Sequence, residues 1–118
     1  VVITTPNIAS LGHRWFGSAW RGLEPPRHLV LFSPRALDQL VGKAGFQRVD
    51  LRTSGRTARS MYVASKINQA RMRGVVPADE RNIWVTLQRY LFQFSEEFLR
   101  LFLVDVGEEI FYIGVKPL

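Results

Sequence analysis

The apolar residues of this chain follow two spacings, one typical of strands and one typical of helices. Val1 to Thr5 is a β-branched run that ends at Pro6, which predicts a short buried strand followed by a Pro6-Asn7 turn. Residues 47–54 alternate between apolar and polar, which predicts a strand with one solvated face at a sheet edge. Residues 109–116 are apolar at successive positions, so we expect a central strand covered on both faces.

The segment that follows Ser33 carries the signals of a helix. Ser33 suits the N-cap and Pro34 suits the first helical position. Gly45 is expected to end the helix in the left-handed conformation, with Phe46 folding back on the last turn. Between these ends one apolar stripe runs at helical spacing, formed by Leu37, Leu40, Val41 and Ala44.

A second, longer helix is predicted over residues 82–104. Its apolar stripe consists of Trp84, Leu87, Leu91, Phe94, Phe98, Leu101 and Phe102. A narrow polar stripe opposite consists of Arg89, Gln93, Glu96, Glu97 and Arg100. So wide an apolar arc needs a large partner surface. Three interpretations are open: a core helix, a lid over a substrate cleft, or a surface that binds a membrane or a second copy. We predict self-association through this helix.

The intervening segments are less regular. Residues 8–31 are rich in glycine, proline and aromatic side chains, and we expect an ordered loop or a short helix there. Residues 55–65 have no clear pattern. The stretch from Arg48 to Arg73 holds seven basic residues against one acid, Asp50. It would suit phosphates or an anionic membrane surface, but we favour a solvated, partly mobile linker.

Composition narrows the chemistry. At 118 residues and 47% apolar content, one globular domain is expected. The chain has no cysteine, so thiol nucleophiles and disulfides are excluded, and its two histidines lack neighbours at metal-ligand spacing. Neither a signal peptide nor a membrane span is apparent, and a cytoplasmic location is expected. The net charge of +6 comes mostly from arginine, which genome composition can also explain.

The order of these motifs resembles the C-terminal third of a class I S-adenosylmethionine-dependent methyltransferase. The motifs are the Thr-Pro-Asn turn, the aromatic loop, the Ser-Pro helix, Ala44-Gly45-Phe46 and the final Lys116-Pro117. The resemblance is nearest to small-molecule methyltransferases related to the ubiquinone-biosynthesis O-methyltransferases. It implies an α/β, Rossmann-like fold in which the last strand inserts antiparallel between the two before it.

The resemblance covers residues 1–54 and 107–118 well, with residues 55–106 as a mostly helical insertion. Residues 1–118 are therefore interpreted as a single partial domain that lacks its N-terminal part. A chain that opens directly in a strand pattern agrees with a cut piece. The family's glycine-rich cofactor turn has no counterpart, since Gly12, Gly17 and Gly22 are five apart and follow the wrong strand. S-adenosylmethionine is thus expected in the parent protein, and neither cofactor binding nor activity is expected of this chain alone.

The resemblance implies substrate-side roles for Asn7, Trp15, Trp20 and His28. Asn7 lies beyond a carboxyl strand end, where ligands of open α/β sheets bind, or else it stabilises its own turn. His28 stands where related O-methyltransferases carry a histidine near the substrate, and an imidazole there can act as a base. The alternative is that His28 is a loop residue whose side chain is hydrogen-bonded to the backbone. Trp15 and Trp20 would wall an aromatic pocket or else pin the loop as core. His13 is a weaker candidate for a substrate role.

Two functions follow. The first is the substrate-side portion of a methyltransferase that acts on a small-molecule methyl acceptor, with donor and acceptor held in line. The second is a non-catalytic basic α/β module that binds an anionic partner, either nucleic acid or a membrane surface, or a partner chain. No fold signature of nucleic-acid binding is visible, so nucleic acid is the least expected of these partners.

Overall fold

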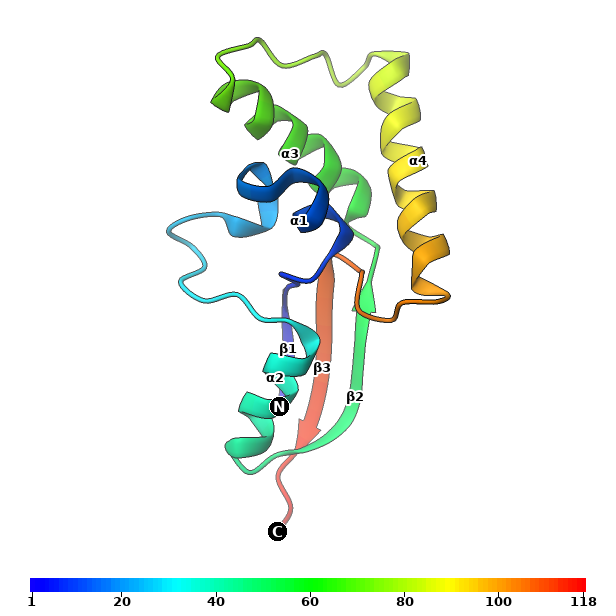
Figure 1. Cartoon of the computed structure of the whole chain (residues 1–118). Helices are drawn as coiled ribbons and strands as arrows, with labels where there is room; N and C mark the ends of the chain where they lie inside the picture. Colours follow the sequence, from blue (N-terminus) through cyan, green and yellow to red (C-terminus); the bar gives the residue numbers. More distant parts are fainter.

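The centre of the fold is a three-stranded sheet in which the last strand of the chain lies between the other two. A computed structural model describes residues 1–118. Strand β3 (Glu109–Val115) pairs antiparallel with β1 (Val2–Pro6) on one side and β2 (Gln47–Ser54) on the other (Figure 1). The strand order is β1-β3-β2, so β1 and β2 run in the same direction. The protein is a mixed α/β fold, as the sequence predicts.

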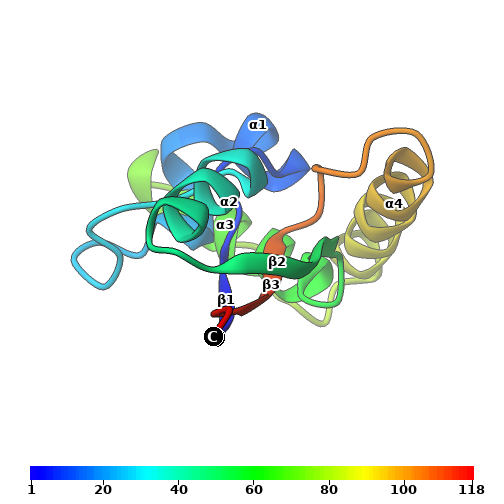
Figure 2. The same ribbon diagram turned by 90° about the horizontal axis from the view of Figure 1, so that it is seen from below.

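The strands lie where the sequence predicts them, but they are less buried. β1 is an edge strand, and Val2 is 65% exposed, so the prediction of a buried strand there is wrong. β3 is central, as expected, yet only the face that carries Ile110, Tyr112 and Gly114 is buried. Phe111 and Ile113, on the other face, are half-buried. Helix α2 (Pro34–Lys43) lies over one side of the sheet only (Figure 2).

The edge strand β2 departs from strict alternation at one point. Its register against β3 shifts between Arg48 and Asp50, which makes Val49 a bulge residue. The alternating pattern predicts that Val49 faces the covered side of the sheet, but Val49 is exposed. Beyond the bulge the expected faces are restored, and Thr53 is buried.

The ends of α2 follow the sequence closely. The Ser33 hydroxyl accepts a hydrogen bond from the Ala36 amide at 3.2 Å, and Pro34 occupies the first turn. Gly45 has φ +87°, and the Phe46 amide donates to the Val41 carbonyl at 3.2 Å, which closes the helix in a Schellman motif.

One face of α2 forms a small core with the sheet, which we call the sheet core. It consists of Leu37, Val41, Ile110 and Tyr112. Leu40 was expected in the same stripe but is half exposed. The sheet offers α2 only a narrow strip, so the helix buries two of the three large apolar residues in its stripe.

Residues 8–31 combine short helical turns with irregular segments, as expected. They comprise α1 (Leu11–Phe16) and two 3₁₀ turns, η1 (Gly17–Ala19) and η2 (Arg21–Leu23). Ser10 caps α1, because its hydroxyl accepts from the His13 amide at 3.0 Å.

Residues 55–106 are mostly helical, which agrees with the predicted insertion, and contain α3 (Ala58–Met72) and α4 (Ile83–Arg100). The favoured interpretation of residues 48–73 as a mobile linker is wrong, since β2 and α3 occupy most of that stretch. α3 is ordered because its buried side chains pack on α1, the 3₁₀ turns and α4. Together they form the helical core: Phe16, Ala19, Trp20, Ala58, Tyr62, Val63 and Phe92.

Helix α4 is present, but its apolar face points to solvent instead of into a core. It ends at Arg100, four residues earlier than predicted, and its only fully buried side chains are Phe92 and Glu96. The apolar stripe faces outward instead, with Trp84, Phe94 and Phe98 all more than half exposed. The core-helix interpretation is therefore wrong. No helix of the chain has both the length and the apolar character needed to cross a bilayer.

Candidate functional site

The carboxyl end of β1 leads into a buried polar region between the sheet core and the helical core. The fully or almost fully buried polar residues of this region, which we call the polar junction, are Asn7, Ser10, Thr53, Glu96 and Glu108. Two of them, Asn7 and Ser10, follow β1; Thr53 lies near the end of β2, and Glu108 immediately precedes β3. The junction therefore lies at the strand ends where the sequence places a candidate site.

Asn7 ties the end of β1 to the loop that enters β3. Its Nδ2 donates to the carbonyls of Asp105 at 2.6 Å and Gly107 at 2.8 Å. Its Oδ1 accepts from the Ala9 amide at 2.9 Å, so the side chain also supports its own turn. Both amide protons are used within the chain, and the side chain is fully buried.

Glu108 is the second centre of the junction. Its Oε1 accepts from the Gly12 amide and its Oε2 from Trp20 Nε1, each at 2.7 Å. A Cβ atom at Gly12 would lie 2.2 Å from Glu108 Oε1, so only glycine permits this approach of helix α1. Burial raises the pKa of the Glu108 carboxyl, while the hydrogen bonds from Trp20 and Gly12 oppose the rise.

Glu96 brings a second buried carboxyl to the same place from α4. Its Oε1 accepts from the Glu108 amide at 3.2 Å, while its Oε2 is buried without a partner. Burial, and then the negative charge of Glu108, raise the pKa of Glu96 to about 8. At neutral pH the Glu96 side chain is therefore mostly protonated in the folded protein.

Two buried acids of this kind resemble the paired carboxyls of acid–base enzymes, but their surroundings differ. General acid–base catalysis requires a group within reach of a substrate. Both Glu96 and Glu108 are completely buried, and three of their four oxygens bond to the chain itself. These hydrogen bonds hold the sheet and the helical core together, and the raised pKa keeps Glu96 protonated at neutral pH.

The four residues singled out by the sequence are only partly brought together. Asn7 and Trp20 both bond to Glu108: the Asn7 backbone amide donates to the Glu108 carbonyl, and Trp20 Nε1 donates to Glu108 Oε2. Trp15 is two-thirds exposed, although it is only five residues from Trp20. The alternative interpretation of Trp20, as a residue that pins the loop, describes its contacts, since it belongs to the helical core.

His28 lies outside the junction, in the segment between η2 and α2. Its Nε2 is 3.7 Å from Glu24 Oε2, and its side chain is about one quarter exposed. Glu24 also pairs with Arg21 and Arg27, so this carboxylate gathers three basic side chains. His13 bonds through Nδ1 to the Ile8 carbonyl at 2.7 Å, and its ring lies 5.2 Å from that of Trp20.

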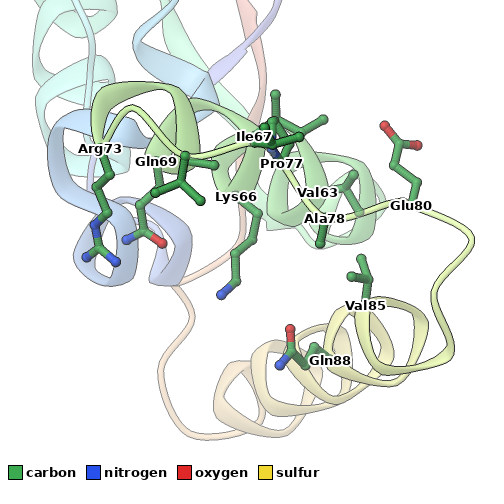
Figure 3. Close-up of a pocket in the computed structure, with 13 residues that line it drawn as sticks. Val63, Lys66, Ile67, Gln69, Arg73, Pro77, Ala78, Glu80, Val85 and Gln88 are labelled. Carbon is green, nitrogen blue, oxygen red and sulfur yellow. The ribbon is translucent and has the colours of Figure 1, made fainter.

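A hollow of the surface lies elsewhere, between α3, residues 73–80 and α4 (Figure 3). It has a volume of about 300 Å³ and a mainly apolar lining that includes Val63, Ile67 and Val85. Lys66 and Arg73 bring positive charge to its rim, with Glu80 on the opposite side (Figure 3). None of the four residues singled out by the sequence lines it.

Sequence reasoning missed both buried acids. The apolar pattern places Glu96 in a narrow polar stripe, and no pattern in the sequence draws attention to Glu108. One signal was present: a buried indole N–H needs an acceptor, and Trp20 has no acidic neighbour close in sequence except Glu24. Nothing in the sequence indicated that the acceptor is 88 residues away.

Comparison of the chain with protein-family models, with curated proteins and with solved structures finds no match. The structure contains no group of three or more histidine, aspartate, glutamate or cysteine side chains that could hold a metal ion.

Proposed function

We propose that residues 1–118 are the acceptor-side, C-terminal part of an S-adenosylmethionine-dependent methyltransferase domain that acts on a small molecule. The observation that carries the proposal is the strand order β1-β3-β2, with β3 antiparallel between two strands of like direction. The sequence resemblance implies this insertion. The Pro6-Asn7 turn at the carboxyl end of β1 agrees with it.

A second observation supports an incomplete sheet. The face of β3 that carries Phe111 and Ile113 is apolar, yet α2 packs on the opposite face. An open α/β domain has helices on both faces of its sheet. We expect the uncovered face to pack against further helices of the complete domain.

The residues of this chain do not fit the cofactor. A nucleotide-type site needs backbone that a ligand can approach, usually through glycines. The space beside Gly12 is filled by Glu108 and that beside Gly22 by the ring of Trp20, so these glycines accommodate the chain's own side chains. The proposal therefore assigns cofactor binding to residues outside 1–118.

On the acceptor side the proposal gives His28 the role of a base and Trp15 that of an apolar wall. Both are at least partly accessible, in contrast to Asn7 and Trp20. The Glu24 carboxylate, 3.7 Å from His28 Nε2, can orient the imidazole toward an acceptor. Asn7 would act as a positioning residue, because it fixes the loop before β3.

The test begins with the reading frame upstream of Val1. We expect a strand followed by a glycine-rich turn, and an acidic residue at the end of the next strand. Calorimetric titration with S-adenosylmethionine should then detect binding by the product of the full frame and none by residues 1–118. His28→Ala in the full product should lower methyl transfer about 100-fold or more with cofactor affinity unchanged. An upstream frame without the turn, or a full product that does not bind the cofactor, refutes the proposal.

A non-catalytic module that binds a partner is the second candidate, and the outward apolar face of α4 favours it. The net charge of +6 would add attraction to anionic surfaces. Salt-sensitive binding of residues 1–118 to duplex DNA or anionic vesicles, together with no cofactor binding by the full product, would select this function.

A further inference from the structure

The exposed face of α4 has the spacing of a coiled-coil seam. Its large apolar residues recur at intervals of three and four, as positions a and d of a heptad do. They are Trp84, Leu87, Leu91, Phe94, Phe98 and, at the helix end, Leu101. Each of the six is between 47% and 77% exposed. We call this set the α4 seam.

The seam cannot turn inward, because the other face of α4 is already fixed. Phe92 packs in the helical core, with its ring 5.0 Å from Tyr62 and 6.3 Å from Phe16. Glu96, one turn along, bonds to the Glu108 amide. The seam is thus on the exposed side of α4, and α4 itself lies at the periphery of the molecule (Figures 1 and 2).

We propose that the α4 seam binds the α4 seam of a second copy of this chain in antiparallel orientation. When the two helices are centred between Leu91 and Phe94, each seam layer joins one aromatic residue to one leucine. The layers are Trp84 with Leu101, Leu87 with Phe98, and Leu91 with Phe94, each repeated by the two-fold axis. Large residues opposite smaller ones interdigitate well. A parallel pair would instead stack Trp84, Phe94 and Phe98 on themselves.

The size of the seam is sufficient for a stable pair. Buried aromatic side chains contribute about 150–250 Å² each, so six seam residues, roughly half exposed, offer on the order of 600–800 Å² per copy. That matches the standard contribution of one partner to a specific interface. A shallow hollow of about 420 Å³ beside Leu87, Leu91 and Phe94 gives an incoming side chain a place to insert.

The charges beside the seam favour a helix over a lipid surface. Membrane-surface helices carry lysine and arginine along the polar border. The positions that border the α4 seam are instead Gln88, Ser95, Tyr90 and Glu97, and the single charge among them, Glu97, pairs with Arg100. The basic side chains beside this border have partners within the chain: Arg59 and Arg89 lie over the Tyr90 ring, and Arg100 pairs with Glu97.

Cysteine cross-linking tests the register, because the chain has no cysteine of its own. A mixture of the Leu87→Cys and Phe98→Cys variants should form a disulfide-linked dimer under mild oxidation. Each variant alone should not, since the two Leu87 positions of the pair are about 16 Å apart along the axis. Leu40→Cys, on the exposed side of α2, is the matched control and should stay monomeric on denaturing gels.

Light scattering tests the association itself. The chain should have about twice the mass of its 13.5 kDa protomer at micromolar concentration. Phe94→Glu should weaken the dimer about 30-fold or more, while its circular dichroism stays unchanged because Phe94 is exposed. Leu40→Glu should leave the mass of the dimer unchanged.

Two results would overturn the inference directly: a monomeric chain at these concentrations, or cross-linking of the Leu87→Cys variant with itself. A third would be a monomer that binds phosphatidylglycerol vesicles and loses this binding in the Phe94→Glu variant. The last would assign the seam to membranes. The inference does not depend on the methyltransferase proposal, because no result above involves the cofactor.

Discussion

At the scale of single residues, two buried carboxyls link the two halves of the molecule. Glu108 joins helix α1 to the start of β3 through the Gly12 amide and the Trp20 indole. Glu96 joins α4 to the same point through the Glu108 amide. Buried polar groups stabilise a fold only when they are bonded, and Glu96 Oε2 has no partner. The stability of the junction should therefore respond to pH.

The pH dependence follows from the raised pKa of Glu96. A carboxyl that titrates near 4.5 when unfolded and near 8 when folded binds an extra proton in the folded state between those values. The free energy of unfolding should thus fall as pH rises from about 4.5 to 8. Glu96→Gln should flatten this slope and make the protein about 1–3 kcal/mol more stable than wild type above pH 8. Urea denaturation at several pH values measures both effects.

The control for Glu96 is its neighbour Glu97, which lies on the exposed side of α4 and pairs with Arg100. Glu97→Gln should retain the wild-type slope. Some slope should also remain in Glu96→Gln, because burial raises the pKa of Glu108 as well. A Glu96→Gln variant with the full wild-type slope would contradict the assignment.

Gly12 provides a steric test of the same junction. A methyl group at this position would meet Glu108 Oε1 at 2.2 Å, and the carboxylate cannot move away without breaking its bond to Trp20. Gly12→Ala should lower the free energy of unfolding by about 1–3 kcal/mol. Gly42→Ala is the matched control, since nothing lies within 4 Å of its added methyl group inside α2. It should stabilise the protein by about 0.5–1 kcal/mol, and equal effects of the two changes would refute the steric argument.

At the scale of elements, local signals determined α2 and long-range packing determined α4. Both ends of α2 follow from Ser33, Pro34 and Gly45, whose effects on backbone conformation act within one turn. The orientation of α4 does not follow from its own stripe. Its partners Tyr62 and Glu108 lie far along the chain, and they bind the face that carries Phe92 and Glu96.

The N-cap of α2 gives a prediction at this scale. Ser33→Ala removes the acceptor for the Ala36 amide and should cost about 1 kcal/mol of stability. Ser95→Ala, at an exposed position inside α4, should be neutral or slightly stabilising, because alanine has the higher helix propensity. Thermal unfolding followed by circular dichroism compares them. A Ser33→Ala variant as stable as wild type would show that the cap contributes nothing.

At the scale of the whole molecule, the chain is elongated, 55 × 31 × 19 Å, with the two cores at opposite ends and the polar junction between them. The α4 seam remains open, and the face of the sheet that carries Phe111 and Ile113 is only partly covered, with Arg52 over the Phe111 ring. The proposals give them different occupants, a second copy for the seam and further helices of the same domain for the sheet. Extended apolar patches on a soluble surface are rare without a partner.

The sequence by itself determined what depends on short-range order. Strand and helix positions follow from the period of apolar residues, and helix ends follow from capping residues, so the three strands, α2 and α4 were predicted close to where they lie. The missed helix, α3, has little periodicity: it buries small and polar residues such as Ala58 and Ser65 beside its aromatic ones.

Tertiary structure alone decided which of these residues meet. Trp20 and Glu108 are 88 positions apart, and Asn7 bonds to carbonyls about 100 positions away, so no local pattern encodes the polar junction. Burial likewise depends on what else is present. An apolar stripe indicates that a helix face needs a partner. Only the packing of α4 against α3 shows that this partner is not in the core of the same chain. That is the physical reason why the sequence could predict a wide apolar face on α4 but could not predict which side of α4 is free.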